Sequence, residues 1–212
     1  MTYFRSSKRP NPVSGDKGFS MIELLTVVLI IGLIAVMALP GALTGVKAYR
    51  LHSNATALST QLGMARLRAT SQNTPYRVQI AMAAAPHQFS LDRLCGTTPV
   101  SVDSNCSAPY QARTGGTEFG PQPVDLGVSF ITTNPGGTSS YPGTITGGTA
   151  STVFYFNTRG MPVDSTGNPL TNGGVVIYLT NGLNLTDAVV VSVGGRVSTY
   201  QWMPSTSTWT LR

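Results

Sequence analysis

A long uncharged run near the N-terminus constrains this chain more than any other feature. Residues 24–39 read LLTVVLIIGLIAVMAL, and only Thr26 and Gly32 interrupt the large apolar side chains and alanines. Counted from Phe19, the segment reaches 21 residues, close to the ~20 that a helix needs to cross a bilayer. The sequence therefore predicts a membrane-spanning helix at this end of the chain.

The residues before this run predict its orientation. Four basic residues stand against one acidic residue in the first 18 positions, and a basic flank stays on the cytoplasmic side of a membrane. The part of the chain after the run is therefore expected on the opposite side. An ordinary secretory signal fits poorly, because Pro40-Gly41-Ala42 offers no small-residue cleavage pattern.

Glu23 distinguishes this segment from a plain signal anchor. A carboxylate within an apolar span costs several kcal/mol unless it is paired or protonated, so it is a candidate functional residue. The alternative interpretation is that the side chain extends to the membrane surface, as long polar side chains do.

Residues 17–25, KGFSMIELL, resemble the processing site of type IV prepilins and type II secretion pseudopilins. The resemblance implies that prepilin peptidase cuts between Gly18 and Phe19 on the cytoplasmic side and then methylates the new N-terminus at Phe19. It implies that Glu23 guides assembly by meeting the N-terminus of the subunit already in a filament, and that Pro40 matches a proline common in the family. The expected partners are the peptidase, other pilins or pseudopilins in the filament, and the inner membrane.

The expected fold is α+β and pilin-like, with one long N-terminal helix packed on a C-terminal antiparallel β-sheet head. Residues 1–18 would be the prepilin leader peptide and 19–40 the transmembrane and polymerisation helix. Residues 41–74 would continue as an amphipathic helix packing on a periplasmic β-rich head, 75–212. The apolar face of that helix repeats at spacings of three and four residues, at Leu51, Ala55, Leu58, Leu62, Ala65 and Ala69.

Proline and glycine residues predict where this helix bends and ends and where the last strands of the head turn. Pro40 and Gly41 predict a kink or break, and the helix is expected to end near Asn73-Thr74-Pro75. Seven strands are predicted after it from β-branched and aromatic residues, at 77–81, 88–94, 126–132, 153–157, 175–180, 188–193 and 197–202. Gly194-Gly195 is expected to join the last two as a two-residue hairpin.

Two head segments are similar to the GspH/FimT group of minor pseudopilins, namely residues 153–162, VFYFNTRGMP, and 189–197, VVVSVGGRV. Some FimT members bind DNA through a Gly-Arg-x-Arg element in the second segment, and Gly195-Arg196-Val197-Ser198 keeps only its first arginine. Since phosphate-driven affinity grows with the number of neutralised charges, Arg196 and Arg159 are candidate DNA contacts, with Arg113 and Arg212 as further cations. The alternative is that Arg196 is simply a solvated hairpin residue.

Composition separates the remaining alternatives. The net charge of +6 neither requires nor excludes a polyanionic partner. Cys95 and Cys106 predict a loop disulfide in an oxidising compartment rather than free thiols. The chain contains two histidines, His52 and His87, and none of the common hydrolase, zinc-protease or phosphate-loop patterns. We therefore expect no enzyme activity, no cofactor and no metal.

These expectations together describe a minor pilin or pseudopilin of a type II secretion pseudopilus or a type IV pilus. The resemblance implies that it would act in the tip or initiation complex. It would start as a single-pass protein of the bacterial inner membrane with its head in the periplasm, and then enter the filament. A FimT-like minor pilin that binds DNA for uptake is the alternative.

Overall fold

The computed structural model describes residues 18–82, 86–95, 112–137, 140–143, 153–170 and 173–212. The predicted leader lies outside these residues except for Gly18. The chain divides into two compact units, Met1–Leu43 and Thr44–Arg212. Among the residues that the structure describes, all strands and the buried apolar core belong to the second unit.

One helix, α1 (Met21–Ser71), makes up the N-terminal part of the structure. Its large apolar side chains from Met21 to Val36 are exposed. Among the described residues no single helix meets the length and apolarity of a membrane span, whereas Met21–Val36 and Gly41–Ser71 meet them when taken together as a bent pair.

The end of α1 is set by local backbone geometry. Asn73 has a φ of 50°, the left-handed conformation that often terminates helices, and Thr74 N donates to Ala69 O at 3.2 Å. Pro75 then prevents the helix from continuing. The predicted end near residues 73–75 is confirmed.

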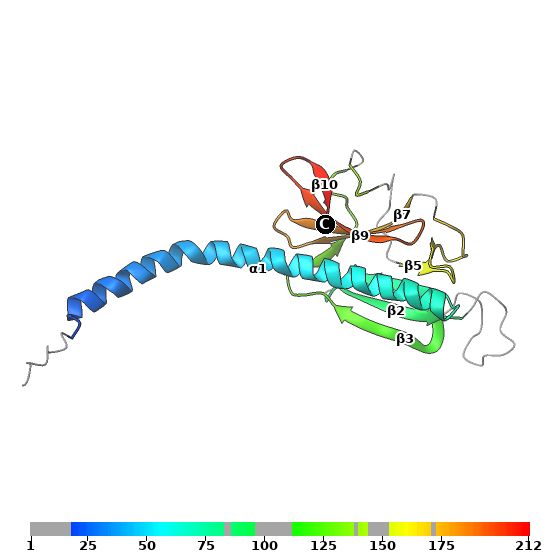
Figure 1. The fold of residues 1–212 in the computed structure, drawn as a ribbon, viewed down its shortest axis with the longest axis horizontal. Coiled ribbons are helices and arrows are strands. Elements are labelled where there is room, and N and C mark those ends of the chain that lie inside the picture. Colours follow the sequence, from blue (N-terminus) through cyan, green and yellow to red (C-terminus); the bar gives the residue numbers. More distant parts are fainter. Residues whose placement is uncertain (1–17, 83–85, 96–111, 138–139, 144–152, 171–172) are drawn as a thin grey trace, which may run out of the picture. The chain divides into compact units, whose positions relative to one another are not determined.

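The apolar face predicted for the second half of α1 is also confirmed. All six positions in the repeat, from Leu51 to Ala69, are at most 2% exposed. They pack against strands of both sheets in a single core, and Figure 1 shows this half of the helix lying along the strands of the head.

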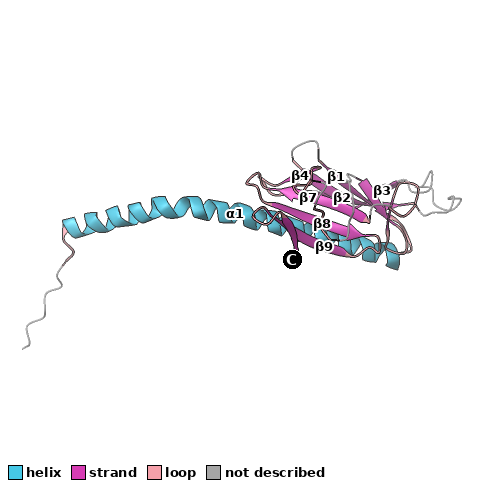
Figure 2. Cartoon of the chain, turned by 90° about the horizontal axis from the view of Figure 1, so that it is seen from above, coloured by secondary structure: helices cyan, strands magenta, loops and turns pink. Residues whose placement is uncertain are grey.

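In the described part of the head the strands form two antiparallel sheets (Figure 2), each with five strands. The first has the order β3-β2-β1-β5-β6 and the second β10-β9-β8-β7-β4. Their bounds are β1 Tyr76–Ala81, β2 Gln88–Leu94, β3 Ala112–Pro123, β4 Ser129–Ile131, β5 Val153–Phe156, β6 Pro162–Val163, β7 Gly174–Thr180, β8 Thr186–Ser192, β9 Val197–Met203 and β10 Thr208–Leu211. The α+β expectation is confirmed, with the strands divided between two sheets.

The last hairpin differs from the prediction. Ser192 N bonds Arg196 O at 2.9 Å, and Gly195 N bonds Ser192 O at 2.7 Å. Gly195 has a φ of 78°, so the strands are joined by the longer turn with a left-handed residue, a common alternative to a two-residue loop. The two-residue hairpin was therefore wrong, although Gly194 and Gly195 do form the turn.

Candidate functional site

The predicted processing bond joins Gly18 to Phe19, just before α1 begins. Phe19 is 83% exposed, and no atom lies within 4 Å of the position that a Cβ on Gly18 would occupy. Non-helical and open to solvent, this bond has the accessibility that proteolysis requires.

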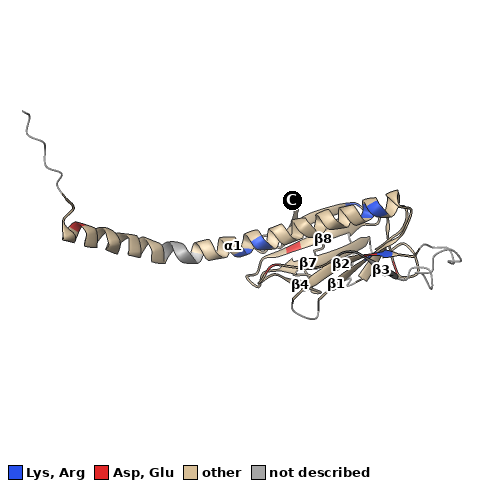
Figure 3. Cartoon of the chain, turned by 90° about the horizontal axis from the view of Figure 1, so that it is seen from below, with Lys and Arg blue, Asp and Glu red and all other residues tan. Residues whose placement is uncertain are grey.

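Glu23 lies in the first turn of α1, which Figure 3 shows in red at the start of the helix. Ser20 O begins the helix by accepting from Glu23 N at 3.0 Å and from Leu24 N at 3.1 Å. The partial positive charge at a helix N-terminus favours a carboxylate there. The Glu23 side chain itself is exposed and accessible to a cation from another chain.

Apolar side chains surround this carboxylate and continue for four turns. Ile22, Leu24 and Leu25 are 71%, 63% and 58% exposed, and the exposed positions that follow lie on every side of the helix. An apolar surface of this extent, exposed on all sides of a helix, indicates a segment that is covered by lipid or by other helices. Residues 14–39 match the prokaryotic N-terminal methylation motif.

This match covers Gly18, Phe19, Glu23 and the apolar run in one register. It indicates a type IV pilin-like protein or pseudopilin that prepilin peptidase processes and that assembles with other pilins. No curated protein and no solved structure is significantly similar to the chain.

In the head, the two turns that carry Arg159 and Arg196 pack against each other. A Cβ on Gly195 would meet Gly160 O at 2.0 Å, and one on Gly160 would meet Arg66 Cγ at 2.9 Å. Only glycine fits at this contact, and Gly160 also has a φ of 74°. The structure therefore brings together the two turns that sequence reasoning named separately.

Arg66 of α1 contacts both of these turns. Its guanidinium donates to Gly194 O at 3.3 Å, and its stem packs on Gly160. Arg66 was not among the residues predicted from the sequence to have a role. The sequence does show a glycine next to each of Arg159 and Arg196. No sequence pattern, however, reveals that two glycines so far apart in the chain are in contact.

Arg196 and Arg212 line one open pocket of about 270 Å³ between α1 and the edge of the second sheet. The remaining lining residues are Ser59, Thr60, Val197, Ser198, Thr199 and Leu211. Arg212 is fixed by two bonds to Gln201 Oε1, at 3.0 and 2.6 Å. Because the lining includes two cations, hydroxyl groups and no acidic side chain, the pocket suits an anion.

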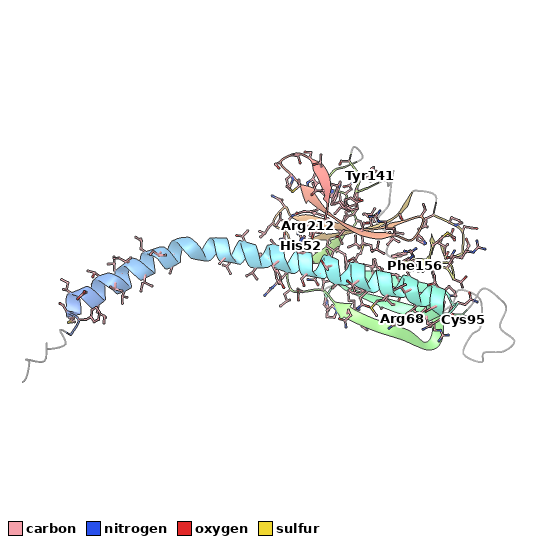
Figure 4. The ribbon with its side chains drawn as sticks, in the orientation of Figure 1. His52, Arg68, Cys95, Tyr141, Phe156 and Arg212 are labelled. Atoms are coloured by element: carbon pink, nitrogen blue, oxygen red, sulfur yellow. The ribbon has the colours of Figure 1, made fainter. Side chains whose placement is uncertain are left out.

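None of the other predicted site residues is among those that line this pocket. Cys95 is buried and disulfide-bonded near the end of α1 (Figure 4), whereas Cys106, the other cysteine of the sequence, lies outside the described residues. The side chain of Arg113 is also outside them. Pro40 lies within α1, and its side chain is not described.

An acid–base pair that sequence reasoning missed, between half-buried His52 and buried Asp187, joins α1 to β8. His52 Nδ1 lies 2.5 Å from Asp187 Oδ2, and the second carboxylate oxygen of Asp187 is buried with no hydrogen-bond partner. Burial raises the pKa of Asp187 to about 7, since desolvation disfavours the carboxylate. Among the described residues, no cluster of three or more His, Cys, Asp or Glu side chains could hold a metal ion.

Proposed function

We propose that this chain is a minor pilin or pseudopilin that acts in the tip or initiation complex of a type II secretion pseudopilus or a type IV pilus. Its role is structural rather than enzymatic. It is cut between Gly18 and Phe19, remains in the inner membrane through residues 19–40 with its head in the periplasm, and is then extracted into a filament.

One observation carries this proposal: an exposed apolar helix segment with Glu23 in its first turn, joined to a β-rich head. In a filament the apolar segments bundle and leave water, which is favourable in proportion to the area removed. The positive amine of one Phe19 then meets the negative Glu23 of another subunit. In a low-dielectric bundle each charge is costly alone, so their pairing selects one axial register.

The assignment to a minor subunit rests on the two head segments that are similar to the GspH/FimT group. Their glycines, Gly160 and Gly195, contact each other, so the two segments form one structural feature, which supports treating them together. The test is the stoichiometry of this subunit in sheared filaments, measured by quantitative mass spectrometry. A content far below that of the main subunit is expected, and equal or greater abundance would contradict a minor role.

A second candidate function, DNA binding for uptake, is favoured by the arginines around the two turns. Arg66, Arg159, Arg196 and Arg212 supply four cations at this part of the head. Each phosphate contact adds to the salt dependence of binding. Asp92 and Asp187 are buried and paired, and the other acidic residues in the described part of the head are Glu118, Asp125 and Asp164.

The test for this second function is DNA binding by the full chain in detergent, titrated with salt. Arg196→Ala should weaken binding and lower the slope of log affinity against log salt by about 1. Arg50→Ala, 16 positions before Arg66 on the same helix and about 24 Å away along its axis, is the matched control. Equal effects of the two substitutions would assign any binding to net charge alone.

A further inference from the structure

The end of the head where α1 enters carries apolar and basic side chains side by side. Leu126 is 90% exposed, the highest value among the large apolar residues of the structure that are described, and Leu183 and Val46 are 40% and 48% exposed. Lys47 and Arg50 are exposed on α1. These five residues are called the head-end patch below.

Contacts within the second unit bring the loop at Leu126 beside both the helix and the turn at Gly182. The Arg50 guanidinium reaches Leu126 O at 3.5 Å, a long contact that places the helix beside the loop. Leu126 and Gly182, the neighbour of Leu183, line the same pocket. Val46 and Lys47 precede Arg50 by four and three residues, so all three lie on one side of the helix.

The charge of the patch is positive. Asp125, the acidic residue beside Leu126, is held by Asn54, whose Nδ2 donates to Asp125 Oδ2 at 2.9 Å and whose Oδ1 accepts from Asp125 N at 3.2 Å. These bonds hold the carboxylate against Asn54 of α1, but Asp125 is itself exposed, so it offsets one of the two positive charges of Lys47 and Arg50. Exposed leucines next to cations that have long apolar stems are typical of surfaces that contact the headgroup layer of a membrane.

The short separation in sequence between the apolar run and the head-end patch also fits contact with the membrane surface. Lys47 follows Leu39, the last residue of the apolar run, by only eight positions, so the chain keeps it close to the end of the membrane segment. The headgroup region extends about 5–8 Å beyond the hydrocarbon on each side of a bilayer, which is within the reach of a few residues and a lysine or arginine side chain.

We infer that the head-end patch rests on the headgroups of a bilayer containing anionic phospholipids while the chain is anchored in the membrane. This inference depends on the membrane anchoring in the proposed function and adds a lipid contact to it. Lys47 and Arg50 bind phosphate oxygens, and Leu126 and Leu183 insert among the upper acyl carbons. The contact holds the unassembled subunit against the membrane and is lost when the subunit is extracted into a filament.

Spin labels on the full chain, reconstituted in vesicles, test the inference. One label is placed at Leu126→Cys and a control label at Ser71→Cys, which is exposed at the far end of α1. A third label at Val28→Cys reports insertion of the apolar run. The measurement is the ratio of collisions with oxygen, which enters bilayers, to collisions with a nickel chelate, which does not.

With Val28 buried, the label at 126 is expected to show a several-fold higher ratio than the label at 71 in vesicles of phosphatidylglycerol and phosphatidylethanolamine. The difference should fall in phosphatidylcholine vesicles and in the double variant Lys47→Gln, Arg50→Gln. The control double variant Arg68→Gln, Arg93→Gln should leave the difference between the ratios at positions 126 and 71 unchanged.

Equal ratios at positions 126 and 71, with Val28 buried, would overturn the lipid contact and leave membrane anchoring intact. A label at Val28 that remains open to the nickel chelate would overturn both. A high ratio at 126 that does not depend on anionic lipid would refute the role of Lys47 and Arg50.

Discussion

His52 Nδ1 lies 2.5 Å from Asp187 Oδ2, and this contact joins the amphipathic half of α1 to β8, the central strand of the second sheet. Asp187 occupies the same face of β8 as the core residues Val189 and Val191 and is 2% exposed. A carboxylate at such a position is costly unless it is protonated or paired. The stability of the head should therefore depend on the proton that this pair holds.

Replacing Asp187 should flatten the dependence of head stability on pH. The pKa of Asp187 is raised from 3.8 to about 7 in the fold, so its contribution is fully present below pH 3.8 and is lost as pH rises through 7. A shift of this size corresponds to at most about 4 kcal/mol. Thermal unfolding of Asp187→Asn should change little from pH 5 to 9, whereas the parent chain loses stability.

Asp164→Asn is the matched control for that experiment. Hydrogen bonds from the Thr166 side chain and from the Asn168 backbone lower the pKa of Asp164, so this group contributes stability above its unfolded pKa and loses it only in acid. The variant should keep the parental pH dependence between pH 5 and 9. If Asp187→Asn also kept it, the buried pair would not be the titrating element.

The contact between Gly160 and Gly195 predicts a sharp difference between two glycine substitutions. Gly195→Ala places a methyl group 2.0 Å from Gly160 O at a φ of 78°. A left-handed conformation alone costs an alanine about 1–2 kcal/mol, and the collision adds to this. We expect a loss of unfolding free energy of more than about 2 kcal/mol.

Gly182→Ala isolates the backbone cost. Gly182 has a φ of 72°, and nothing lies within 4 Å of an added Cβ. Chemical denaturation of this variant should give a loss of only about 1–2 kcal/mol. Similar losses for the two variants would mean that the turns are not in close contact.

Glu23→Gln should impair assembly without affecting processing or anchoring. The amide keeps the size of the side chain but removes the charge that would pair with the amine of Phe19 in another subunit. Filament incorporation, measured by immunoblotting of sheared fractions, should fall several-fold while the mature chain still accumulates in membranes. Thr26→Val, one turn further along the exposed helix, is the control, and an equal defect there would remove the special role of Glu23.

Sequence patterns predicted the elements that are regular and locally encoded. The repeat from Leu51 to Ala69 identified the buried helix face, and strands β1, β2, β5, β7, β8 and β9 were found within one or two residues. Their β-branched and aromatic residues alternate or run together as expected for buried strands.

Three strands were missed for physical reasons. β3 contains Gly115, Gly116 and Pro121 and pairs with β2 through several register shifts, so its sequence is typical of a loop. β6 has two residues. β10 has four residues. It is held against the sheet by Trp209, whose ring lies 5.3 Å from that of Trp202 and 5.7 Å from that of Tyr178.

The tertiary relationships in the candidate sites could not be read from sequence. His52 lies outside the apolar repeat predicted for α1, and its partner is 135 positions away. Asp187 alternates with Val189 and Val191 along one strand, so all three side chains lie on the same face. This alternation could have indicated from the sequence that the carboxylate is buried. Arg66, by contrast, reaches the turns only because two glycines distant in sequence allow their backbones to touch.

The most direct test of the central claim is the intact mass and N-terminal sequence of the chain, purified from membranes of cells with and without prepilin peptidase. The account predicts a mature chain that starts at N-methyl-Phe19 only when the peptidase is present. A chain that retains residues 1–18 in both strains would contradict it and leave a membrane-anchored β-rich protein with no place in a filament.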